Sequence, residues 1–182
     1  MSSDIWSFSA VGQDRPGIVA ALSKVLYEHD CNLSDSTMTQ LAGQFAVVLI
    51  LETGKKTDPN ALSQAIEKLG QEWHLQVNAG PVEESTVEAA SFDGATHLVS
   101  VYGADQAGLT WKVAEAIADS GYNVTDLSTK KIEGSAPVYI LLLEVEAGQQ
   151  ATPVDNLNQR LQALGKELGC SVTVKPVESS DL

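Results

Sequence analysis

The segment "GQDRPGIVAALSKVLYEHDCNLSD", Gly12 to Asp35, decides the fold of this chain. It opens on a turn that carries an acid, an Arg, a Pro and a Gly. An apolar stripe at helical spacing follows, formed by Ile18, Leu22, Val25 and Leu26. The segment then passes through Asn32 into a new stretch. The order predicts a strand-to-helix corner, a helix, and the start of a second strand.

The same segment occurs a second time as "GADQAGLTWKVAEAIADSGYNVTD", Gly103 to Asp126. Matching residues lie 91 positions apart, as Gly12 and Gly103 do, without any gap. The shared landmarks are Gly12/Gly103, Asp14/Asp105, Gly17/Gly108, Asn32/Asn123, Asp35/Asp126 and Gly43/Gly134. A later block repeats at a spacing of 95 positions, with Leu62/Leu157, Leu69/Leu164, Gly70/Gly165 and Pro81/Pro176. Landmarks in the same order indicate a tandem duplication.

Each copy is predicted to run strand, helix, strand, strand, helix, strand. "DIWSFSAVG" and "THLVSVYGA" alternate as half-buried strands do, and "FAVVLILE" and "VYILLLEVE" are typical of interior strands. Pro16 is predicted in the first helical turn with Asp14 as its cap, and Gly43 and Gly134 in hairpin turns. The prediction is an α+β chain of two ferredoxin-like βαββαβ domains, antiparallel sheets with helices on one face. The domains are predicted at 1–83 and 95–182, with an acidic linker at 84–94.

The charge and the cysteines narrow the classes of function. The formal net charge is −13, and the basic residues are spread along the chain, which disfavours direct binding to nucleic acid or to an anionic membrane. Neither a membrane-spanning apolar run nor a signal peptide is recognisable. Cys31 and Cys170 lie far apart in the sequence, so we expect no disulfide. No carboxylate or cysteine stands at metal-ligand spacing from a histidine, so we expect no metal site. A cytoplasmic protein without a cofactor is expected.

Three interpretations remain open for the loop from Gly12 to Gly17. It could be only a structural corner between a strand and a helix. It could bind a small anion, because a helix N-terminus offers free N–H groups and Gly17 lets a ligand approach the backbone; Asn32 would add an amide that both donates and accepts. Catalysis would need a base beside a nucleophile, and the neighbours His29, Asp30 and Cys31 are expected to point in different directions.

The aromatic residues are expected mostly in packing. Trp6, Phe8 and Tyr139 lie in strand patterns and are predicted in the core or at a dimer face. Trp111 follows the second loop, where the first copy has Ala20. An exposed Trp111 would mark a surface that binds a partner, whereas packing is the more common use of such a residue.

"DRPGIVAALSKVLYEHDCNLSDSTM" followed by "GQFAVVLIL" resembles the ACT domain, a ferredoxin-like module that binds amino acids in regulated enzymes and regulators. The resemblance covers almost the whole chain, once per copy. It implies a ligand site at the first strand–helix turn and the start of the second strand, usually where two domains pair. The implied ligand-binding residues are Asp14, Arg15, Pro16, Gly17, Ile18, Asn32, Leu33, Asp105, Gly108, Leu109, Asn123 and Val124. The second loop reads "DQAG", without the Arg and Pro, so its site is expected to be altered or lost.

A chain of two such units resembles the family of glycine cleavage system transcriptional repressors. That resemblance implies a non-enzymatic regulator that responds to a small amino acid, glycine in that family. It also implies action on transcription through a LysR-type protein partner rather than through DNA, and we expect a homodimer. Two alternatives stay open: an interaction module without a small ligand, and a detached regulatory subunit of an amino-acid enzyme. The sequence names neither the ligand nor the partner.

Overall fold

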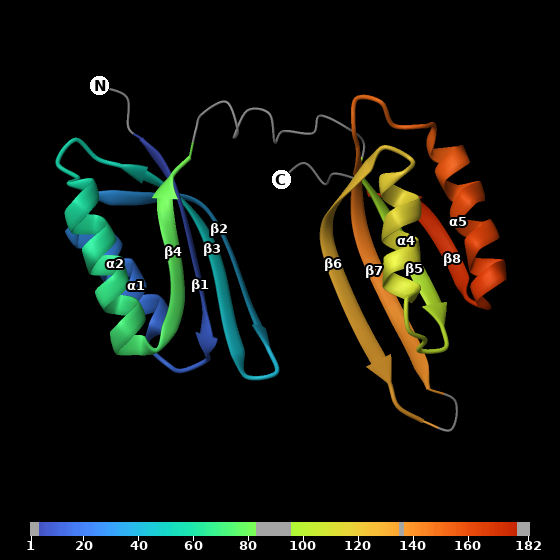
Figure 1. Ribbon diagram of the computed structural model, residues 1–182, viewed down its shortest axis with the longest axis horizontal. Coiled ribbons are helices and arrows are strands. Elements are labelled where there is room, and N and C mark those ends of the chain that lie inside the picture. The colour runs from blue at the N-terminus through green and yellow to red at the C-terminus, as the bar shows by residue number, and fades with distance from the viewer. Residues whose placement is uncertain (1–3, 83–95, 135–136, 178–182) are drawn as a thin grey trace. The chain divides into compact units, whose positions relative to one another are not determined.

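The protein is described from a computed structural model, which covers residues 4–82, 96–134 and 137–177 (Figure 1). The chain divides into two compact units, residues 1–90 and 91–182. The predicted linker at 84–94 lies outside the described residues. Each unit is described by itself.

Unit 1 is a four-stranded antiparallel sheet with both helices on one face (Figure 1). The strand order is β2-β3-β1-β4, so β1 lies between β3 and β4, and β2 and β4 form the edges of the sheet. Its elements are β1 (Ile5–Gln13), α1 (Ile18–Glu28), β2 (Cys31–Leu41), β3 (Gln44–Thr53), α2 (Pro59–Trp73) and β4 (Leu75–Pro81). This is the predicted βαββαβ order.

Unit 2 repeats that topology with the order β6-β7-β5-β8. Its elements are β5 (Thr96–Gly103), α4 (Leu109–Ala118), β6 (Tyr122–Ile132), β7 (Val138–Ala147), α5 (Val154–Leu168) and β8 (Ser171–Pro176). The α+β fold class and the duplication are confirmed at the level of elements, topology and register.

The core of each unit lies between the sheet and its two helices, and it follows from the periodicity of the sequence. Along β3 every second residue is buried, from Phe45 to Thr53, because successive strand residues face opposite sides. The stripe predicted for the first helix is buried at Ile18, Leu22 and Leu26 and half-buried at Val25. The other helices bury similar stripes: Leu62, Ile66 and Leu69 in α2, Leu109, Val113, Ala116 and Ile117 in α4, and Leu157 and Leu161 in α5. Trp6 and Phe8 are buried in the core, as predicted.

The start of α1 differs from the prediction. The N-cap is Gly17, in the left-handed conformation at φ 101°, and Pro16 precedes it instead of opening the helix. No side chain caps the helix; the backbone N–H of Asp14 donates to the carbonyl of Gly43 (2.9 Å). The Asp14 cap was therefore wrong, because the backbone of this residue is held by the β2–β3 turn. In that turn Ala42 and Gly43 both have positive φ, which fits a tight hairpin.

A β-bulge interrupts the edge strand of both sheets at matching positions. The register shifts between Leu33 and Asp35 in β2, and between Val124 and Asp126 in β6. The residue inside each bulge carries a hydroxyl that donates to the neighbouring strand: Ser34 to Ile50 (3.4 Å) and Thr125 to Glu144 (3.3 Å). Bulges redirect side chains and are frequent beside functional sites. Each bulge residue lies two positions after the Asn that the two units share, Asn32 and Asn123.

Candidate functional site

The first candidate region is the exposed N-terminus of α1. Gly17 is exposed, and the first hydrogen bond of the helix runs from Ala21 N–H to the carbonyl of Gly17 (2.9 Å). The N–H groups of the three residues between them have no partner within the helix, as at any helix start. They carry the positive end of the helix dipole, which favours a carboxylate. Gly108 repeats this geometry at α4, with φ 87° and no side-chain cap.

Arg15 is used inside unit 1. Its Nη2 donates to the backbone carbonyl of Trp73 at the end of α2, and its guanidinium stacks on the Trp73 ring, 5.2 Å from the centroid. The same ring lies beside the loop glycine, since a Cβ on Gly17 would stand 3.0 Å from the edge of the indole. Arg15 therefore ties the loop to the end of α2, a partner 58 positions away.

Unit 2 makes the same tie with different residues. Gln106 occupies the place of Arg15, and its Nε2 donates to the carbonyl of Leu168 (2.7 Å), the counterpart of Trp73. Asp105, at the start of this loop, forms an ion pair with Lys131 of β6 (3.0 Å). The second loop thus keeps its position without the Arg and Pro of the first.

Asn32 lies at the other end of the same sheet. It pairs with Glu52 in β3, and Glu52 pairs with Ile5 at the start of β1. The Gly17 loop follows the end of β1, and the 11 residues of α1 separate the two regions by ~16 Å. Within one unit the structure does not bring Asn32 and Leu33 to the loop. Asn123 and Val124 are separated from Gly108 in the same way by α4.

Asn32 borders a cavity of about 280 Å³ that the sequence did not predict. The cavity is lined by Tyr27, Asp30, Cys31, Asn32, Glu52, Thr53 and Gly54. Asp30 has the positive φ of 57° that an Asp tolerates, and its carbonyl accepts from the N–H of Gly54 (2.6 Å). Its carboxylate and that of Glu52 give the cavity negative charge, which suits an ammonium group. In unit 2 Gly121 occupies the place of Asp30.

The geometry argues against the neighbours His29 and Cys31 as a catalytic pair. The Nδ1 of His29 contacts the carbonyl of Val25 (2.8 Å), within its own helix. The Cys31 thiol donates to the carbonyl of His29 (3.5 Å) rather than to the ring. Partial burial raises the pKa of the Cys31 thiol, the negative charge of Asp30 adds to this, and a hydrogen bond from Thr57 opposes it. A reactive thiol needs the opposite shift.

We expect both thiols to be slow nucleophiles. Burial also raises the pKa of Cys170, so at pH 8 both carry less thiolate in the folded chain than in the unfolded chain. Alkylation by iodoacetamide, followed by mass spectrometry, should be slower in buffer than in urea for both residues. Faster alkylation of Cys31 in the folded protein would contradict this and restore a nucleophilic role.

The described residues contain no cluster of His, Cys, Asp or Glu with the geometry to hold a metal ion. Among the helices of those same residues, none has the length and apolar character needed to cross a membrane.

The duplicated fold and the matching loops define a class: a chain of two ferredoxin-like units. A family model of the ACT domain matches residues 8–80 and again residues 95–175. The chain belongs to the ACT domain family, with one domain in each unit. The resemblance on the Gly12–Asp35 segment is confirmed, and the protein is an ACT-domain regulatory protein.

Relatives and solved structures agree with this fold. The UPF0237 protein of Methanocaldococcus jannaschii is 40% identical over 70 residues, which cover 38% of this chain and 78% of the relative. A crystal structure of an unknown protein from Galdieria sulphuraria superimposes with a TM-score of 0.80 at 21% identity, covering 97% of this chain and 99% of that one. A protein assigned as a glycine cleavage system transcriptional repressor superimposes with a TM-score of 0.69 at 19% identity, with the same coverage. At these identities the two structures establish the fold.

Proposed function

We propose that this protein is a non-enzymatic sensor of a small amino acid, with glycine as the candidate ligand, that modulates transcription of amino-acid metabolism genes by contacting a protein partner. The proposal rests above all on one repeated feature. Each unit presents an exposed glycine of positive φ at a helix N-terminus that no described side chain caps. Such a site offers N–H groups and positive potential to a carboxylate. The absence of a side chain on Gly17 favours close approach by a small ligand.

The cavity beside Asn32 supports the amino-acid class of the ligand. An amino acid carries an ammonium group as well as a carboxylate, and Asp30 and Glu52 provide negative charge next to the Asn32 amide. Because α1 separates this cavity from Gly17, the two regions of one unit do not contact the same small ligand. The homodimer is a further part of the proposal, and sedimentation equilibrium would measure its mass.

Thermal unfolding against a panel of free amino acids tests the proposal. A ligand at about 100 times its Kd should add ~2.7 kcal/mol to the free energy of unfolding. For a domain of this size, at about 4–8 °C per kcal/mol, the midpoint of thermal unfolding should rise by roughly 10–20 °C. A selective shift with one amino acid identifies the signal. The absence of a shift with every amino acid at millimolar concentration would contradict the sensor and favour the ligand-free interaction module.

Substitution of the two Asn residues separates ligand binding from folding. Asn32→Ala should abolish most of the ligand-induced shift, because it removes an exposed amide at the proposed site. Without ligand it should change the free energy of unfolding by no more than about 0.5 kcal/mol, since the side chain is exposed and makes no described hydrogen bond. Asn123→Ala is the matched control; its site lacks the Asp30 carboxylate, so it should retain the shift. An equal loss of the ligand-induced shift in Asn32→Ala and Asn123→Ala would contradict the proposal that the unit 1 site binds the ligand and the unit 2 site does not.

The role in transcription needs a separate experiment. Affinity purification of the tagged chain, with and without the identified amino acid, should recover a LysR-type transcription factor. Recovery of an amino-acid enzyme instead would favour the alternative, a detached regulatory subunit. The structural likeness to the protein assigned as a glycine cleavage system transcriptional repressor supports the first outcome. The acidic net charge of −13 agrees with action through a protein rather than on DNA.

A further inference from the structure

The helix face of unit 2 contains a groove that its loop site does not account for. The groove lies between α4 and α5 and has a volume of about 380 Å³. Its lining includes the indole of Trp111, which is 62% exposed, the carboxylate of Glu115 and the apolar side chain of Leu164. Trp111 and Glu115 lie four residues apart on α4, so their side chains share one face of the helix.

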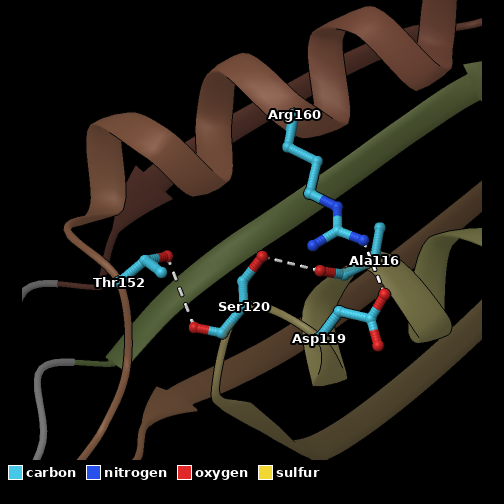
Figure 2. A network of polar contacts seen from close by, with 5 residues as sticks. All are labelled: Ala116, Asp119, Ser120, Thr152 and Arg160. Carbon is cyan, nitrogen blue, oxygen red and sulfur yellow. Dashed lines mark hydrogen bonds and ion pairs between the residues drawn. The ribbon is translucent and has the colours of Figure 1, made fainter.

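Among the described charged side chains around this groove, two cations are paired with two carboxylates, and one further carboxylate has no ion pair. Lys112 pairs with Glu167 (3.2 Å), and Arg160 reaches from α5 to pair with Asp119 just after α4 (2.6 Å; Figure 2). Within the described residues Glu115 makes no ion pair. An exposed indole and an uncompensated carboxylate therefore stand side by side at the groove.

The matching groove of unit 1 lacks both features. At a spacing of 91 positions, Trp111 corresponds to Ala20 and Glu115 corresponds to Lys24. Lys24 forms an ion pair with Glu28 (3.7 Å). Trp73 lines the unit 1 groove, but the guanidinium of Arg15 already stacks on its ring, and Glu28 and Glu72 are paired with lysines. An exposed indole beside an unpaired carboxylate is therefore a feature of the unit 2 groove.

Unit 1 nevertheless shows which group an indole of this protein accepts. There the guanidinium of Arg15 stacks on Trp73. Unit 2 has Gln106 in place of Arg15, and the ring of Trp111 is exposed beside Gly108, whose Cβ position lies 3.9 Å from that ring. A guanidinium over the face of an indole is attracted by the ring quadrupole, and Trp is the best partner for it.

We propose that the α4–α5 groove of unit 2 is a docking site for an arginine side chain of a different protein. The guanidinium stacks on Trp111 and pairs with Glu115, and the apolar residues beside that arginine contact Leu164. The docking site rests on one part of the proposed function, the contact with a protein partner, and specifies the chemistry of that contact. It does not depend on the binding of an amino acid.

The partner is a different protein because this chain has no arginine to spare. Its two arginines are Arg15 and Arg160, and both guanidinium groups already have partners, on Trp73 and Asp119. A second copy of the chain also carries the same net charge of −13, so long-range electrostatics favour a basic partner instead.

The probe is a capped peptide, acetyl-Leu-Ser-Arg-Ser-Leu-amide, and its control is the same peptide with citrulline, a neutral isostere of arginine. The full chain, labelled with ¹⁵N at its indoles, is titrated in low salt. Saturable movement of the Trp111 indole resonance, with the resonances of Trp6 and Trp73 unmoved, is expected with the arginine peptide. The citrulline peptide should bind at least about fivefold more weakly than the arginine peptide, because it lacks the cation.

Two variants convert this groove toward its counterpart in unit 1. Glu115→Gln should weaken the arginine peptide several-fold, and Trp111→Ala with Glu115→Lys should abolish binding. The unit 1 residues at these two helix positions make the double variant compatible with folding, which hydrogen exchange of the β5 and β7 amides of unit 2 verifies. Because this variant lacks the Trp111 reporter, its peptide binding is measured by titration calorimetry. Equal binding of both peptides, or no movement of Trp111, would overturn the proposal. So would a Trp111 resonance that moves with protein concentration alone, which would assign the groove to a second copy.

Failure here is distinguishable from failure of the sensor. The peptide titration contains no free amino acid, and the thermal-shift panel contains no peptide. A positive panel with a negative titration rejects only the docking site, and the reverse rejects only the amino-acid ligand.

Discussion

Arg15→Ala is expected to lower the free energy of unfolding of unit 1 by about 2 kcal/mol. The substitution removes a charged hydrogen bond to the Trp73 carbonyl, of a kind that contributes ~1.5–3 kcal/mol. It also removes the stacking of the guanidinium on the indole, which contributes ~0.5–1 kcal/mol near a surface. Arg15 is partly exposed, so the lower part of the combined range applies.

Fluorescence can measure this loss for unit 1 alone. Trp6 and Trp73 belong to unit 1, and Trp111 belongs to unit 2, so a Trp111→Phe background leaves only unit 1 emission in a urea titration. The chain itself offers the matched control, because Gln106 makes the corresponding hydrogen bond in unit 2. Arg15→Gln should therefore lose less stability than Arg15→Ala. The titration contains no amino acid. An unchanged midpoint for Arg15→Ala would therefore show that the contacts of Arg15 with Trp73 do not stabilise unit 1, and it would favour a ligand-binding role for Arg15.

The role of Arg15 illustrates what the sequence could and could not predict. The family motif places it among ligand-binding residues, and the motif is local. Its observed partner is at the end of a helix 58 positions further on, and only the packing of α1 beside α2 brings the two together. The duplication contained a signal for this contact, since Gln106 and Leu168 correspond to Arg15 and Trp73 at the two repeat spacings. Arg15 and Gln106 differ in type, but both side chains carry N–H donors, which indicates that both bind the same backbone carbonyl position.

The fold was predictable because it depends on periodicity, which is a property of each segment. The buried stripe of α1 and the alternating burial of β3 both follow from residue spacing. The site depends on which ends of the elements meet. The motif joins Gly17 and Asn32 as neighbours, whereas α1 carries the chain back along the sheet and separates them. The bulges at Ser34 and Thr125 were equally hidden, because an extra strand residue becomes visible only against the register of its partner strand.

Gly121→Ala is expected to destabilise unit 2 by about 3 kcal/mol or more. Gly121 has φ 83°, a conformation that costs an L-residue ~1–2 kcal/mol. The new Cβ would also stand 2.8 Å from the Cα of Ala151, a backbone atom, and such overpacking costs ~1–3 kcal/mol. The turn cannot relax freely, because the N–H and hydroxyl of Thr152 both donate to the carbonyl of Ser120 (2.9 and 3.4 Å; Figure 2 shows the hydroxyl contact).

Two further glycines of unit 2 separate the backbone strain from the overpacking. Gly169 has a positive φ of 65° with open space around its Cβ position, so Gly169→Ala should lose only ~1–2 kcal/mol. Gly134 has open space and no positive φ, so Gly134→Ala should change stability by no more than about 0.5 kcal/mol. Hydrogen exchange of the β5 and β7 amides measures the stability of unit 2 by itself. If Gly121→Ala lost no more than Gly169→Ala, the contact with Ala151 would contribute nothing, and the close fit of the α4–β6 turn against the start of α5 would be refuted.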